Sequence, residues 1–171
     1  MKLPPEWREF IGLLCLHHAR FLVVGAHALA AHGRPRATQD IDILVEPTRA
    51  NARRVCSALA DFGFTALAKE VQAFSTPDRM ATLGKPPLRI DVMTSISGVS
   101  FHQAWRGRVT ATLDGLEVGF LGRAEFVRNK RASGRPKDLL DIALLEEVTP
   151  PARRPRKAAR KRPRAKRRPT S

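Results

Sequence analysis

The segment 38–45, TQDIDILV, most narrows what this chain can fold into, because it predicts a strand with two carboxylates on one face. Side chains two residues apart in a strand point to the same face. Asp40 and Asp42 therefore project together, roughly 7 Å apart along the backbone. Ile41 and Ile43 point the other way, towards a core.

The Asp40 and Asp42 pair has two interpretations. Two carboxylates on one face repel each other and resist losing water unless a cation lies between them. Carboxylate oxygens are hard ligands that suit Mg²⁺, so the pair predicts a magnesium site. The alternative is two solvated aspartates at a strand edge, which is the more common case for an isolated pair. The neighbouring motifs decide between them.

The acidic strand is preceded by a motif suited to an anion. Residues 21–24 are wholly apolar and predict a short buried strand, which ends at Gly25 and Ala26 before a helix of small residues at 27–32. Gly25 lets the backbone approach a ligand closely, and the N–H groups that open a helix favour phosphate. The alternative is a glycine that only ends the strand.

A third carboxylate, Asp91, lies in another candidate strand, 88–93, in which apolar and polar residues alternate. In such a strand Asp91 shares its face with Arg89 and Met93, and it would complete a cluster of three carboxylates with the segment 38–45. Two metal ions in such a cluster clamp the attacking and leaving oxygens of a phosphoryl displacement. The alternative is a surface aspartate beside Arg89.

The remaining patterns alternate between helix and strand periodicity. They predict helices at 4–18, 47–62, 100–106, 123–131 and 136–147, a strand within 64–80, and a hairpin at 108–121 with Asp114 and Gly115 as its turn. In the last helix Leu140, Ala143 and Leu144 are expected to face inward. Together the elements predict an α+β fold, a mixed β-sheet flanked by helices, in one domain at residues 1–148.

The formal net charge of +15 is concentrated near the end of the chain. Residues 151–171 hold 11 Lys and Arg and no acidic residue, whereas the first 150 residues hold 20 basic and 16 acidic ones. Prolines and like charges, with almost nothing apolar to bury, predict a disordered basic tail at 149–171. Such a tail suits the phosphates of RNA or DNA, an acidic partner, or simple solubility.

The sequence argues against membrane and disulfide classes of protein. No apolar run approaches the ~18 residues that span a bilayer, and the N-terminus lacks a signal-peptide pattern. We therefore expect a cytoplasmic protein with no membrane partner. Cys15 and Cys56, both in apolar helical patterns, predict buried reduced thiols and no zinc site.

Four segments occur in a distinctive order: VVGAHA at 23–28, RATQDID at 36–42, RIDVM at 89–93 and NKRASGRPKDLLD at 129–141. Together they resemble motifs of the minimal nucleotidyltransferase superfamily, whose members share a polymerase-β-type palm. The last segment resembles the small prokaryotic branch that includes the AbiEii-type toxins. The resemblance covers about residues 5–147 and implies a nucleotidyltransferase fold.

The resemblance implies a role for each matching residue. Asp40 and Asp42 would bind Mg²⁺ that bridges the nucleotide phosphates, and Asp91 would hold a second Mg²⁺ ion and help deprotonate or orient the incoming hydroxyl. Nucleotide binding is implied for Gly25, for the backbone amide of Ala26, for Lys130, for Lys137, and for Asp138, which would hold Lys137 or act in the site. Many family members have Gly-Ser where this chain has Gly25-Ala26, so a hydroxyl is missing here.

The implied activity is a Mg²⁺-dependent transfer of an NMP group from an NTP to a hydroxyl acceptor, either an RNA 3′ end or a protein. A toxin–antitoxin system with a cognate antitoxin is a setting that the resemblance alone suggests. Two alternatives stay open: a palm that has lost catalysis and binds nucleic acid, and an antitoxin-like interaction protein.

Overall fold

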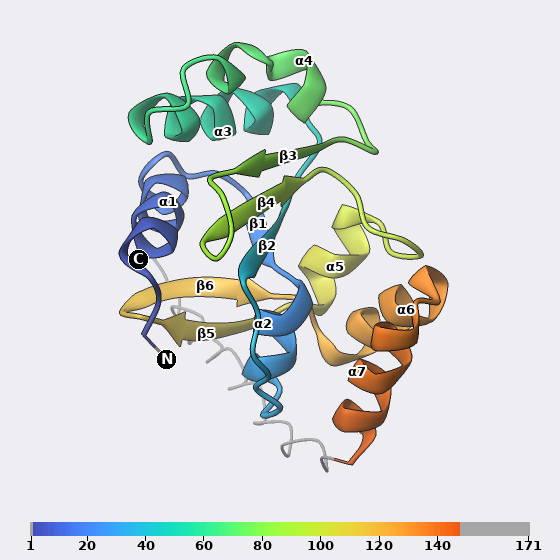
Figure 1. Ribbon diagram of the computed structural model, residues 1–171. Helices are drawn as coiled ribbons and strands as arrows, with labels where there is room; N and C mark the ends of the chain where they lie inside the picture. The colour runs from blue at the N-terminus through green and yellow to red at the C-terminus, as the bar shows by residue number, and fades with distance from the viewer. Residues whose placement is uncertain (1, 148–171) are drawn as a thin grey trace, which may run out of the picture.

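The structure is a computed structural model that describes residues 2–147 (Figure 1). The expected tail at 149–171 lies outside the described residues. The strands are β1 (Phe21–Val23), β2 (Asp40–Val45), β3 (Met80–Leu83), β4 (Arg89–Met93), β5 (Val109–Leu113) and β6 (Leu116–Phe120). The helices are α1 (Pro5–Leu16), α2 (Gly25–Ala31), α3 (Arg49–Asp61), α4 (Val71–Phe74), α5 (Phe101–Gly107), α6 (Arg123–Ser133) and α7 (Pro136–Glu146), with a 3-10 turn, η1 (Leu67–Lys69).

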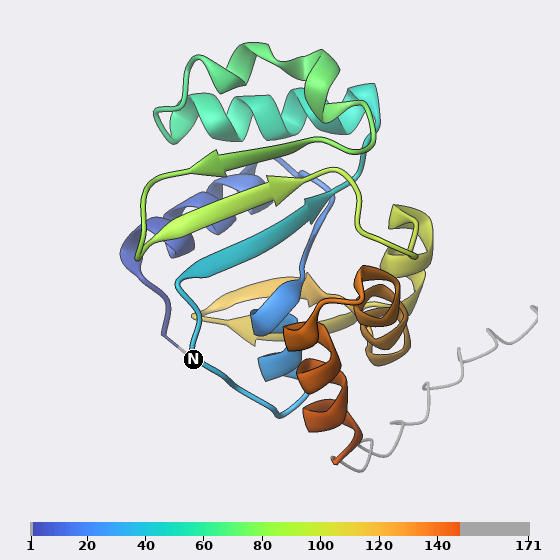
Figure 2. The same cartoon turned by 45° about the vertical axis from the view of Figure 1, so that its right-hand side comes forward.

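The strands form one six-stranded sheet in the order β3-β4-β2-β1-β6-β5. β2 pairs with β4, and β1 with β6, in parallel, whereas the other neighbours are antiparallel. Helices lie on both sides of this mixed sheet (Figure 2). The expected α+β class, a mixed sheet flanked by helices, is confirmed.

The two faces of β2 differ, as the alternation of apolar and acidic residues predicts: one is buried in the core and the other carries the carboxylates. Ile41 and Ile43 are fully buried, in the same hydrophobic cluster as Phe10 of α1 and Leu59 of α3. Figure 2 shows α1 behind the sheet, while α2, α6 and α7 lie in front of it. Because successive side chains alternate between faces, the carboxylates of β2 are directed away from this core.

Local signals in the sequence set several element boundaries. Thr48 caps α3, because its side chain accepts the Asn51 N–H at 3.3 Å. Ser100 and Gln103 form a capping box at the start of α5. The β5–β6 hairpin turns at the predicted Asp114 and Gly115, whose φ angles of 48° and 84° match a tight hairpin turn.

The strand predicted within 64–80 is wrong for most of that range. The structure has η1 and α4 there, and β3 begins only at Met80. Leu67, Val71 and Phe74 are spaced by four and three residues, so they fall on one side of a helical path and pack against the core. The short length of each turn hid this helical period in the sequence.

Two exclusions made from the sequence concern membranes and disulfides. Among residues 2–147, no helix is both long and apolar enough to cross a membrane. Cys15 and Cys56 are free cysteines, but only Cys56 is buried. Cys15 is half-buried, which corrects the expectation of two buried thiols.

Candidate active site

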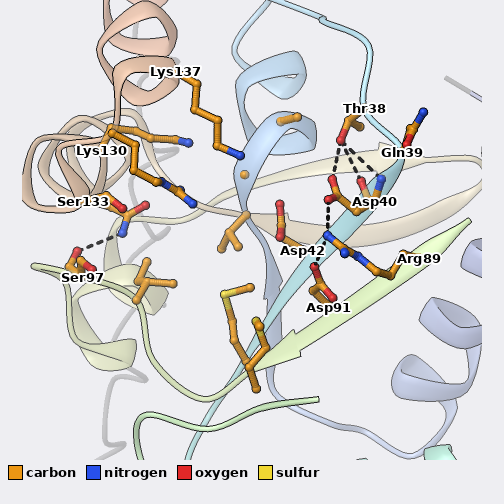
Figure 3. Close-up of a pocket in the computed structure, with 18 of the residues that line it drawn as sticks. Thr38, Gln39, Asp40, Asp42, Arg89, Asp91, Ser97, Lys130, Ser133 and Lys137 are labelled. Carbon is orange, nitrogen blue, oxygen red and sulfur yellow. Dashed lines mark hydrogen bonds and ion pairs between the residues drawn. The ribbon is translucent and has the colours of Figure 1, made fainter. Parts of the chain in front are cut away.

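The parallel pairing of β2 with β4 brings the three predicted carboxylates to one place. In this register Asp40 lies opposite Arg89 and Asp42 lies opposite Asp91. Figure 3 shows the side chains of Asp40, Asp42 and Asp91 on one side of these strands. The expectation that Asp91 joins the other two carboxylates is therefore confirmed.

Two of these carboxylates are held by hydrogen bonds from both sides. Asp40 accepts the Thr38 hydroxyl at 2.5 Å on Oδ1 and Arg89 Nη2 at 2.9 Å on Oδ2. Asp91 accepts the Thr82 hydroxyl at 2.7 Å on Oδ1, and its Oδ2 lies 3.2 Å from the same Arg89 Nη2. Burial works to raise the pKa of Asp40, but the bonds from Thr38 and Arg89 outweigh it, and the pKa is lowered.

Asp42 is the carboxylate with uncompensated negative charge. Burial, and then the neighbouring charges of Asp40 and Asp91, raise its pKa from 3.8 to about 6, although Lys130 and Lys137 act in the opposite direction. A carboxylate in this state gains if a cation approaches it. A cation beside Asp42 would therefore favour its ionised form.

Gly25 opens α2 directly against Asp42. Its φ of +61° lies in the left-handed region, and a Cβ at this position would overlap the Asp42 carboxylate. The backbone before it is tied to the same strand, since the Val24 N–H donates to the Asp42 carbonyl at 2.9 Å. Only glycine satisfies both the backbone angle and the close approach.

We expect Gly25→Ala to displace Asp42 and to reduce any divalent-cation binding at the cluster by at least about tenfold, because a methyl group would occupy the carboxylate position. Isothermal titration with Mn²⁺ measures this. The matched control is Gly33→Ala, at the end of the same helix, where φ is +88° but no atom lies within 4 Å of the added Cβ. Equal losses in both variants would show that backbone strain alone is responsible.

Lys130 of α6 is buried among carboxylates of α7. Its ammonium lies 2.6 Å from Asp138 and 2.9 Å from Asp141. Arg135 also donates to Asp138 at 2.7 Å, and Arg36 donates to Asp141 at 2.8 and 3.2 Å. Burial acts to raise the pKa of Asp138, but the bonds from Arg135 and Lys130 lower it to about 2. This network attaches α7 to α6 and to the loop before β2.

The network corrects two expectations about the last helix. Asp138 binds Lys130 and Arg135 and does not bind Lys137, which was one of the two roles that the resemblance implied for it. Leu140 and Leu144 are 66% and 36% exposed, and Ala143 is exposed as well. The inward residues of α7 are Asp138, Asp141, Ile142 and Leu145. The two carboxylates take the place of apolar side chains because both pair with the buried ammonium of Lys130.

Lys137 is the lysine left available to a ligand. Within residues 2–147 it forms no ion pair, and Figure 3 shows its side chain extended into the cleft towards Asp42. Its positive charge favours the ionised forms of Asp40 and Asp42. Lys130 also lines the cleft, but its ammonium is already engaged by carboxylates, so its role there is electrostatic.

A cleft of about 790 Å³ contains these groups. This volume is in the range of sites for small molecules and cofactors. Residues from distant parts of the chain line the cleft, including the predicted Gly25, Ala26, Asp40, Asp42, Asp91, Lys130 and Lys137. Asp138 is fully buried and does not line the cleft. It is linked to the cleft through its hydrogen bonds to Lys130 and Arg135, which do line it.

Some functional groups were not predicted. Thr82 lies on β3, which begins at Met80, where the segment 64–80 ends, and no element was predicted at Thr82. Arg89 was placed on the same face as Asp91, but its bridge to Asp40 depends on the pairing of two strands 49 residues apart. The two-residue spacing of Arg89 and Asp91, which puts both on one face of a strand, was the one signal in the sequence for the position of Arg89.

The carboxylate cluster offers oxygen ligands for a divalent cation, but an arginine lies among them. Within residues 2–147, no three His, Cys, Asp or Glu side chains are already arranged to hold a metal ion. The guanidinium of Arg89 lies between Asp40 and Asp91 instead. The donor chemistry does fit, since the three carboxylates offer the hard oxygen ligands that suit Mg²⁺. Burial, and then the charges of Asp40 and Asp91, raise the pKa of Asp42, and a bound cation would oppose both effects.

Comparisons of the chain with protein-family models and with curated proteins found no match. Any functional assignment therefore depends on the residues and their geometry.

Proposed function

We propose that this protein is a Mg²⁺-dependent nucleotidyltransferase that moves an NMP group from an NTP to a hydroxyl acceptor. The observation that carries the proposal is the register of β2 and β4, which sets Asp42 beside Asp91 and next to the glycine that opens α2. The four motifs that resemble the nucleotidyltransferase superfamily contribute the same residues to one cleft.

The chemistry of the cleft is suited to phosphoryl transfer, in which a protein mainly positions groups and stabilises charge. Mg²⁺ held by Asp40, Asp42 and Asp91 would supply charge stabilisation for the phosphates. Lys137 extends over the same space and is placed to contact a phosphate. Asp91, held by Thr82, is placed to orient an incoming hydroxyl.

The acceptor class follows from charge. The sequence beyond α7 holds 11 Lys and Arg in residues 151–171, and contact with nucleic-acid phosphates is one of the uses that such a segment suits. An RNA 3′ end is therefore the acceptor we favour over a protein side chain. A toxin–antitoxin setting is supported by the resemblance alone.

The test is transfer of label. The full chain is incubated with each of the four α-labelled NTPs, Mg²⁺, and the RNA and protein fractions of a cell extract. We expect label in the RNA fraction with at least one NTP, and no label after EDTA removes the metal. Absence of transfer from every NTP to both fractions would contradict the proposal, as would transfer that persists in EDTA.

A second candidate is a protein of the same architecture that binds nucleic acid without catalysis. Ala26 favours it, because alanine has no hydroxyl to offer a phosphate. Tight RNA binding that is unchanged by EDTA and by combined Asp40→Ala and Asp42→Ala substitution, without any transfer, would identify this function. Loss of that binding on deletion of residues 149–171 would assign it to the basic segment.

A further inference from the structure

We propose that Arg89 is a built-in counter-ion of the carboxylate cluster, and that a divalent cation binds there only by displacing it. This proposal rests on the proposed function, because it assumes that the cluster receives a cation. It goes further by identifying a residue that sets how tightly the cation is bound.

The position of Arg89 carries the inference. One nitrogen, Nη2, lies 2.9 Å from Asp40 Oδ2 and 3.2 Å from Asp91 Oδ2. It therefore bridges two carboxylates of adjacent strands, which is the place where a shared cation would neutralise both. The other oxygen of each carboxylate accepts a threonine hydroxyl, so the oxygens that face Arg89 are the ones left for a ligand.

The bond made by Arg89 is one that a cation can replace. The strongest arginine–carboxylate contacts are bidentate, with two parallel N–H···O bonds. Arg89 instead uses the single Nη2 for both partners, and its Nε is buried without a hydrogen-bond partner in the described structure. Its side chain is 38% exposed and lines the cleft, so the guanidinium has open space to enter when released.

The charge of Arg89 determines whether its removal strengthens or weakens divalent-cation binding. A guanidinium within about 3 Å of both carboxylates repels an incoming cation, and it must give up its own ion pairs before that cation binds. The two cations therefore compete for the same oxygens. Removing the charge of Arg89 should strengthen divalent-cation binding, whereas a residue that merely shapes the site would weaken binding when removed.

The experiment measures Mn²⁺ and Mg²⁺ binding to the full chain by isothermal titration, in Arg89→Gln, Arg89→Lys and the wild type. We expect Arg89→Gln to bind on the order of tenfold more tightly than the wild type, and Arg89→Lys to remain closer to it because a charge is kept. The control is Arg53→Gln on an exposed position of α3, which removes the same net charge away from the cleft and should leave affinity unchanged.

Circular dichroism establishes that each variant is folded before titration. Unchanged or weaker binding in folded Arg89→Gln would overturn the inference, as would an absence of binding in every variant. Tighter binding with no NMP transfer by any variant would support the role of Arg89 and reject the proposed activity. Transfer by the wild type, combined with equal cation affinities in all variants, would support the proposed activity and reject the role of Arg89.

Discussion

Asp42→Asn is expected to reduce NMP transfer by about 10² to 10³-fold while making the metal-free protein more stable at neutral pH. The variant removes the carboxylate that lies against Gly25 and opposite Asp91 and that is proposed to hold Mg²⁺, so transfer is reduced. It also removes a buried negative charge that Asp40 and Asp91 repel. Stability and activity are therefore expected to change in opposite directions, as is common at functional sites.

The pH dependence follows from the raised pKa of Asp42. The folded protein binds this proton more tightly than the unfolded chain, so wild-type stability falls as pH rises from 3.8 to about 6. Above that range the stability advantage of Asp42→Asn is complete, at about 3 kcal/mol. Below pH 3.8 the advantage disappears. Thermal unfolding in EDTA between pH 3 and pH 7 measures this advantage, and we expect a melting-temperature difference of about 6 to 12 °C at pH 7.

Asp61→Asn is the matched control, because this aspartate of α3 is 53% exposed and, among residues 2–147, pairs with His17 alone. We expect that variant to keep full transfer and to show no stability gain at pH 7. Added Mg²⁺ should stabilise the wild type and narrow its difference from Asp42→Asn, since a ligand bound only to the folded state raises stability. A less stable Asp42→Asn in EDTA would contradict the electrostatic account.

Asp138→Ala is expected to destabilise the protein by about 3 kcal/mol, because it leaves the buried ammonium of Lys130 with Asp141 as its remaining carboxylate partner. The melting temperature should fall by about 6 to 12 °C. Loosening of α7 should also displace Lys137, so nucleotide binding is expected to weaken along with stability. Urea unfolding and nucleotide titration measure the two effects.

The contribution of Asp138 to folding stability changes with pH in the opposite direction to that of Asp42. The pKa of Asp138 is lowered to about 2, so its contribution is present above 3.8 and is lost as pH falls towards 2. The difference between wild type and Asp138→Ala should shrink over that interval. Leu140→Ala on the exposed side of the same helix is the control, since it removes a side chain that is 66% exposed. A comparable loss of stability in that control would show that α7 is held by apolar packing instead.

The sequence by itself determined the features that depend on near neighbours in the chain. Alternation in 38–45 predicted which side chains of β2 are buried, and Asp114 with Gly115 predicted the hairpin turn. The same alternation in 88–93 placed Asp91 on one face with Arg89. These predictions succeeded because strand periodicity and turn chemistry act over a few residues.

The tertiary structure alone decided which charges meet. Arg89 reaches Asp40 across 49 residues, and Lys130 takes the carboxylate that was expected to hold Lys137. The inward face of α7 is acidic for the same reason, since the buried ammonium of Lys130 on α6 and the partly exposed guanidinium of Arg36 in the loop before β2 make carboxylates favourable there. Such pairings are set by the packing of segments that are distant in sequence, and a local pattern of apolar and polar residues carries no record of them.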